Sequence, residues 1–197
     1  MDKRWKNLLL LGVLILVVAA AAFIILQPGP GRAKTFGEGF EEMKAFFAGK
    51  GIDAGALDIE DLAALSSAEL AELKVELQSF ASSFNGPGSA KELAGVYVSA
   101  IDLGAKSKAQ GKKTNQIDAL SLQDYCSNIV LFKERDSLEE EKIGLLEQLK
   151  TNINSFVGKY SNEAQQIGLK PLEVDIEALR SANGERATVT AQLEGAC

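Results

Sequence analysis

The stretch 104–114 (GAKSKAQGKKT) contains the residue types that hold phosphate groups in nucleotide-binding loops. Such a loop needs four residues between its glycines and a serine or threonine directly after its lysine. Here six residues separate Gly104 from Gly111, and Lys112 is followed by a second lysine. The stretch also follows a predicted helix and not a strand. The sequence therefore predicts no nucleotide site, and no cofactor is expected.

Four lysines in this stretch form the main positive cluster of an otherwise acidic region. One interpretation is a solvated helix end, where cations are favoured by the helix dipole. The other is a docking patch for an acidic partner or an anionic headgroup. The residues concerned are Lys106, Lys108, Lys112 and Lys113.

Few other residues of the chain are candidates for acid–base catalysis or metal binding. The chain has no histidine, which excludes Ser-His-Asp triads, Cys-His pairs and HExxH zinc sites. Glu139, Glu140 and Glu141 are expected on the first turn of a long helix and in solvent, where they favour the positive end of its dipole. The spacing of a calcium loop is absent. We expect neither a catalytic nor a metal site, and so no enzyme.

The two cysteines, Cys126 and Cys197, are too few and too far apart for a structural zinc site. They could form one disulfide if the domain lies in an oxidising compartment. The alternative is a pair of reduced thiols, one buried and one at a frayed chain end.

The charge of the chain argues against nucleic acid as a partner. The 197 residues include 21 basic and 27 acidic side chains, of which five basic and one acidic precede position 35. The remainder therefore has 16 basic and 26 acidic residues and a formal charge of −10. A surface this acidic repels phosphate backbones.

These residues must be positioned by a chain that opens with an apolar segment. Residues 1–7 form a short basic tail, and residues 8–26 contain no charge or strongly polar group. At about 1.5 Å per residue, the 19 residues from Leu8 to Leu26 would span roughly 28 Å, close to the hydrocarbon thickness of a bilayer. We expect a transmembrane helix, followed by a Pro/Gly linker over 27–35.

Two questions about this segment stay open. Ala19 to Ala22 would suit cleavage of a signal peptide, although the apolar run continues beyond them to Leu26. Basic residues lie on both sides of the segment, so they barely decide its orientation. The short basic tail favours a signal-anchor with a cytoplasmic N-terminus and an extracytoplasmic domain in a single-pass membrane protein.

Residues 36–169 are expected to form an antiparallel bundle of four or five helices. Apolar residues recur there at the three- and four-residue spacing of packed or coiled-coil helices. Three serine–glutamate pairs have the form of a capping box, in which the two side chains satisfy free backbone N–H groups at a helix start. These pairs are Ser66 with Glu69, Ser89 with Glu92, and Ser137 with Glu140.

The segment 170–197 is expected to be a β-hairpin packed on the bundle. Asn183-Gly184 is a strong signal for a two-residue turn. Pairing outward from that turn places apolar residues on one face and polar residues on the other. The fold class is therefore mostly α, with a transmembrane helix, a helical bundle and a C-terminal hairpin.

This pattern predicts a non-enzymatic, membrane-anchored protein that serves as an interaction or scaffolding module of the cell envelope. Its partners would be the membrane, through residues 8–26, and a protein or a second copy of the chain. Two alternatives are an extracytoplasmic small-ligand-binding module and a pilin-like filament subunit. The latter normally continues its apolar helix into the domain, whereas Pro28 and Pro30 would interrupt it in this chain.

Overall fold

The computed structural model describes residues 32–56 and 59–197, and residues 35–197 form one compact unit. Seven α-helices lie in these ranges. The helices are α2 (Phe36–Ala48), α3 (Ile59–Ala64), α4 (Ser67–Ser83), α5 (Gly88–Asp118), α6 (Ile129–Lys159), α7 (Ser161–Gln166) and α8 (Ile176–Ala196).

The predicted basic tail, the membrane segment and most of the linker lie outside the described residues. Within the ranges that are described, no helix is both long and apolar enough to cross a membrane. The membrane anchor therefore stays a prediction.

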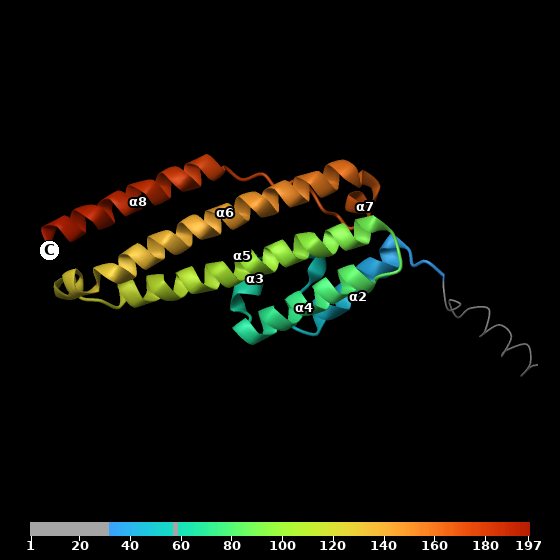
Figure 1. The fold of residues 1–197 in the computed structure, drawn as a ribbon, viewed down its shortest axis with the longest axis horizontal. Helices are drawn as coiled ribbons and strands as arrows, with labels where there is room; N and C mark the ends of the chain where they lie inside the picture. Colours follow the sequence, from blue (N-terminus) through green and yellow to red (C-terminus); the bar gives the residue numbers. More distant parts are fainter. Residues whose placement is uncertain (1–31, 57–58) are drawn as a thin grey trace, which may run out of the picture. The chain divides into compact units, whose positions relative to one another are not determined.

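Helices α5 and α6 are the two longest elements and run side by side for most of their length (Figure 1). Each has 31 residues and spans about 45 Å. Helices α3 and α4 pack on α5, with Leu62 of α3 against Gly104 near the middle of that helix, whereas α8 packs on the first part of α6. The expected helical bundle is confirmed, with six helices in the described part of 36–169 where four or five were expected.

One end of this unit holds the main hydrophobic core, built from α2 to α5, the second half of α6, and α7. Phe47 is fully buried, and its ring lies 4.9 Å from that of Tyr97. The Tyr97 hydroxyl donates to the Ala54 carbonyl at 2.9 Å, and burial raises the pKa of this phenol. The apolar stripes of the sequence supply this core, which includes Leu70, Leu73, Leu77, Phe80, Phe84, Leu93, Val96, Tyr97, Ala100, Ile101, Leu149, Ile153 and Phe156.

Helix starts follow the capping-box pattern only in part. Ser66 and Glu69 form the predicted box, with hydrogen bonds of 2.8 and 3.2 Å, and Thr35 caps α2 in the same way. Ser89 is instead buried in the first turn of α5, where its hydroxyl makes no hydrogen bond. Ser137 lies in the interior of α6, which begins eight residues earlier at Ile129. Those two predicted caps are wrong.

The predicted β-hairpin over 170–197 is also wrong. Residues Ile176–Ala196 form the single helix α8, and no strand occurs in the described ranges. Asp175 caps the helix by accepting a hydrogen bond from the Ala178 amide at 3.0 Å. Asn183 is not in a turn but on the side of α8 that faces α6. The buried residues of α8, Ile176, Asn183 and Thr190, recur every seven positions, so a helix places all of them on the side that packs on α6 and pairs its backbone internally as well.

Gly104 allows α3 to approach α5 closely. A Cβ at this position would lie 2.7 Å from Leu62 Cβ and 3.4 Å from the Leu62 carbonyl carbon. Leu62 is fully buried, so it cannot move without displacing α3. We expect Gly104→Ala to lower the free energy of unfolding by about 1–3 kcal/mol, although alanine favours helices.

The matched control is Gly95→Ala in the same helix, where a Cβ meets no atom within 4 Å. This change should raise the free energy of unfolding by up to about 1 kcal/mol. Chemical denaturation followed by circular dichroism measures both variants. Equal effects of the two substitutions would contradict the close approach.

Candidate functional site

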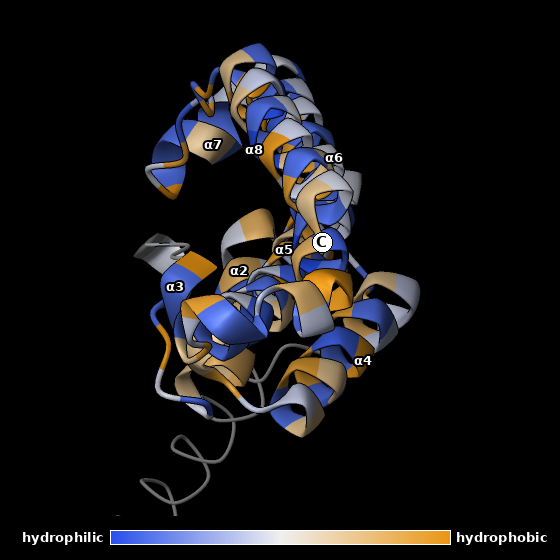
Figure 2. Ribbon diagram, turned by 90° about the vertical axis from the view of Figure 1, so that its left-hand side faces the viewer, coloured by the Kyte–Doolittle hydropathy of each residue, from blue (hydrophilic) through white to orange (hydrophobic). Residues whose placement is uncertain are grey.

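The end of the unit that lies away from the main core is a layer of three helices. We call it the three-helix layer: residues 104–118 of α5, residues 129–148 of α6, and α8. Helix α8 packs chiefly on α6, and Figure 2, which looks along the long helices, shows it apart from α2, α3 and α4. No residue of α8 belongs to the main core. The contacts that hold α8 in this layer are therefore not those of the main core.

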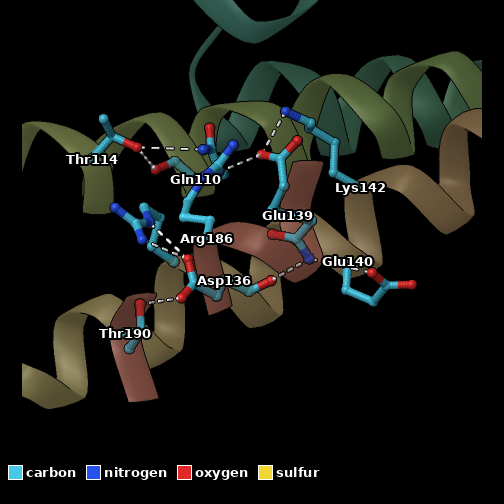
Figure 3. A network of polar contacts seen from close by, with 10 residues as sticks. Gln110, Thr114, Asp136, Glu139, Glu140, Lys142, Arg186 and Thr190 are labelled. Carbon is cyan, nitrogen blue, oxygen red and sulfur yellow. Dashed lines mark hydrogen bonds and ion pairs between the residues drawn. The ribbon is translucent and has the colours of Figure 1, made fainter. Parts of the chain in front are cut away.

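A polar seam joins α6 to α8 (Figure 3). We use this name for the polar side chains that meet between the two helices, of which all but the exposed Glu140 are buried or half-buried. The seam consists of Asp136, Glu139 and Glu140 on α6, and Asn183, Arg186 and Thr190 on α8.

Asp136 has the most completely satisfied carboxylate of the seam, and the residue is only 7% exposed. Its Oδ1 accepts from Nε and Nη2 of Arg135, at 2.9 and 2.6 Å. Its Oδ2 accepts from the Thr190 hydroxyl at 2.6 Å. Both oxygens are thus engaged by the chain's own groups, which is the usual condition for burying a carboxylate.

Asn183 crosses the seam two turns before Thr190 in α8. Its amide nitrogen donates to the Asp136 carbonyl at 3.3 Å and to Glu140 Oε2 at 3.2 Å. Its amide oxygen is buried and has no hydrogen-bond partner among the described residues. A buried polar atom without a partner costs about 1–3 kcal/mol, so this part of the seam holds α8 weakly.

Glu139 is buried, contrary to the expectation that it lies in solvent. Its Oε2 accepts from Lys142 at 2.8 Å and lies 4.0 Å from Nη1 of Arg186. Glu139 to Glu141 are also in the interior of α6 and not on its first turn. The first turn of α6 therefore carries none of the three expected glutamates.

Ion pairs flank the seam toward the two ends of α8. Arg180 binds Glu147 at 2.6 Å, and this hydrogen bond raises the pKa of the guanidinium. Lys133 binds Glu194 at 2.6 Å near the C-terminus. Because all four side chains are at least one-third exposed, water screens both pairs and they contribute little to stability.

A disulfide joins Cys126 to Cys197, as predicted, with the two Cα atoms 5.3 Å apart. Cys126 lies in a short 3-10 turn just before α6, and Cys197 is the residue that ends α8. Closing a loop between residues 71 positions apart can add about 4 kcal/mol to stability. The bond therefore ties the free end of α8 to the start of α6.

The four lysines of the predicted docking patch lie on the α5 strip of the layer, and three of them bind within the domain. Lys106 pairs with Glu141, and Lys113 pairs with Glu134 at 2.5 Å, so both link α5 to α6. Lys108 donates to the Leu65 carbonyl. Lys112 is exposed. The docking role of this cluster stays a prediction, with Lys112 the most accessible of its members.

Three of the open grooves on the surface of the described residues are among the best formed, and none of these three collects a reactive set of side chains. The groove between α5 and α6 has a volume of about 610 Å³ and includes the Lys106–Glu141 pair and Asp102. The other two, of about 560 and 800 Å³, lie beside α2 and between α6 and the segment before α8. In the described part of the chain, no three acidic or cysteine side chains are placed to hold a metal ion.

The sequence does contain a signal for the polar seam, although the same residues also fit the pattern of a hairpin. Positions at three- and four-residue spacing run along α8, but the middle ones are polar. They are Ile176, Leu179, Asn183, Arg186, Thr190, Leu193 and Cys197.

No family model, curated protein or solved structure matches this chain.

Proposed function

We propose that this chain is a single-pass, membrane-anchored, non-enzymatic protein of the cell envelope, whose extracytoplasmic helical domain engages or scaffolds other proteins. The observation that carries the proposal is the three-helix layer, cross-linked by Cys126–Cys197 and outside the main core. Such a layer offers extended helical surfaces on an element that the disulfide holds in place.

The disulfide supports the extracytoplasmic placement. Disulfides persist in oxidising compartments and are rare in the cytosol of most cells. An uncharged apolar segment at residues 8–26 is long enough to serve as the anchor.

Side chains exposed on and beside the layer support an interaction role. Four large apolar side chains stand out as exposed, and three of them belong to this end: Leu122 at 82%, Val130 at 61% and Val189 at 62%. The fourth, Val75 at 63%, lies on α4. Single exposed apolar residues are common on protein surfaces, so these three positions mark the end of the domain to be probed and do not by themselves define a patch. The buried carboxylates of the layer, by contrast, are neutralised by the chain's own cations and do not support acid–base catalysis.

The test is site-specific photo-crosslinking of the full-length protein in its native membranes. A photoreactive amino acid is placed at Leu122, Val130 or Val189, with Val75 as the matched exposed control. We expect discrete adducts from the layer positions, in the membrane fraction, and fewer from position 75. A protein recovered from the soluble fraction, or layer positions that give no adduct above the control, would overturn the proposal.

A further inference from the structure

We infer that Cys126–Cys197 is a redox switch: its reduction releases the C-terminal half of α8 from α6 and uncovers the α6 surface beneath it. The inference rests on how little holds this half of the helix beyond the Thr190–Asp136 hydrogen bond and the Arg186–Glu139 ion pair. It does not depend on the proposed function.

The non-covalent contacts of α8 weaken toward its C-terminus. Ile176 is buried at the first turn, but beyond Thr190 no residue of α8 is buried. Leu193 is half-buried, and the Lys133–Glu194 pair is exposed. Exposed ion pairs contribute little because water screens them. The disulfide is therefore the strongest attachment of the last two turns.

The sequence of α8 has a low intrinsic propensity to form a helix. Its interior contains Gly184 and Gly195, and a run of β-branched residues at Thr188, Val189 and Thr190. Both residue types disfavour helix relative to alanine. Most of the stability of a helix in a protein comes from tertiary packing, so α8 depends on being held against α6.

The bond is also placed where a reductant can reach it. Both cysteines are exposed, and Cys197 directly follows the last turn of α8. A thiolate of a dithiol reductant can attack one sulfur, forming a mixed disulfide and freeing the other cysteine as a thiol. The second thiol of the reductant then displaces the remaining cysteine. Two electrons pass to the protein, both cysteines become thiols, and the reductant leaves as a disulfide.

Release would change what α6 presents to solvent. The side of α6 beneath α8 carries Asp136 and Glu139, whose present partners include Thr190 and Arg186 of α8. Without α8, these carboxylates lose those partners and regain water. The reduced protein would therefore carry a mobile C-terminal arm and a newly exposed acidic stripe on α6.

Hydrogen–deuterium exchange of the full-length protein tests the switch, before and after treatment with a dithiol reductant. We expect exchange in residues 184–196 to rise by at least about tenfold on reduction. Exchange in α4 and in the first half of α5 should stay unchanged, because those elements belong to the main core. The double variant Cys126→Ser/Cys197→Ser should show the same pattern without reductant.

A second variant distinguishes release of α8 from destabilisation of the whole domain. Gly184→Ala introduces a Cβ that meets no atom within 4 Å, so it should strengthen α8 without altering its packing. When the disulfide is reduced, we expect the rise in hydrogen–deuterium exchange of α8 to be up to about fivefold smaller in this variant than in the unsubstituted protein. Unchanged exchange in α8 after complete reduction would overturn the inference. A rise of equal size throughout the main core would do so as well.

Discussion

Phe156→Ala should lower the free energy of unfolding by about 3–5 kcal/mol. The side chain is 2% exposed, and its ring lies 6.4 Å from that of Phe36 on α2 and 5.3 Å from that of Tyr160. Truncation removes the buried apolar surface and leaves a cavity where α2 meets α6. Both neighbours are aromatic and held in place: Phe36 belongs to α2, and Tyr160, which caps α6, donates its hydroxyl to Glu92 on α5. The site can therefore collapse only in part.

The measurement is chemical denaturation of the purified full-length protein, followed by helical circular dichroism. The matched control is Val130→Ala on the same helix, because Val130 is 61% exposed and its truncation should change stability by less than about 0.5 kcal/mol. A loss below about 1 kcal/mol for Phe156→Ala would contradict the packing described for this core.

The main core was predictable from the sequence because its contacts are made by large apolar residues at helical spacing. Leu70, Leu73 and Leu77 lie on one side of α4, and all three are buried. Burial of such side chains is the dominant favourable contribution to folding, so their spacing reports directly on the helix face that packs.

The three-helix layer was not predictable in the same way. The face of α8 that packs on α6 has polar residues at its centre, including Asn183 and Thr190. Binary patterning treats such positions as solvated, and the dipeptide Asn183-Gly184 then favours a turn. Only the carboxylates of α6, which lie far away in the sequence, provide the partners that allow these residues to be buried.

The helix starts were likewise only partly predictable from the sequence. A serine followed three residues later by glutamate satisfies backbone groups only if the chain before it is not helical. That holds at Ser66, but at Ser137 the preceding residues already form the first two turns of α6. Glu92 likewise fits the pattern of a cap, whereas it binds Lys159 at 2.6 Å and Tyr160 at 2.8 Å, and these hydrogen bonds lower its pKa.

Asp136→Ala should lower the free energy of unfolding of the oxidised protein by about 2–4 kcal/mol. Two groups lose the partner that lets them be buried: the Arg135 guanidinium, whose side chain is 15% exposed, and the Thr190 hydroxyl, in a residue that is 4% exposed. Removing one member of a buried ion pair costs more than the pair contributes, because the remaining charge is left in a poorly solvated position.

A double-mutant cycle with Thr190→Val separates the α6–α8 contact from the effect on Arg135. Thr190→Val removes the hydroxyl that donates to Asp136 at 2.6 Å while keeping the shape of the side chain. We expect the two substitutions to be non-additive by about 1–2 kcal/mol, as for a hydrogen bond to a charged group. Strict additivity would mean that Asp136 acts within α6 alone. In that case the Thr190–Asp136 hydrogen bond would contribute nothing to holding α8, and Asn183, Arg186 and the disulfide would be its remaining attachments to α6.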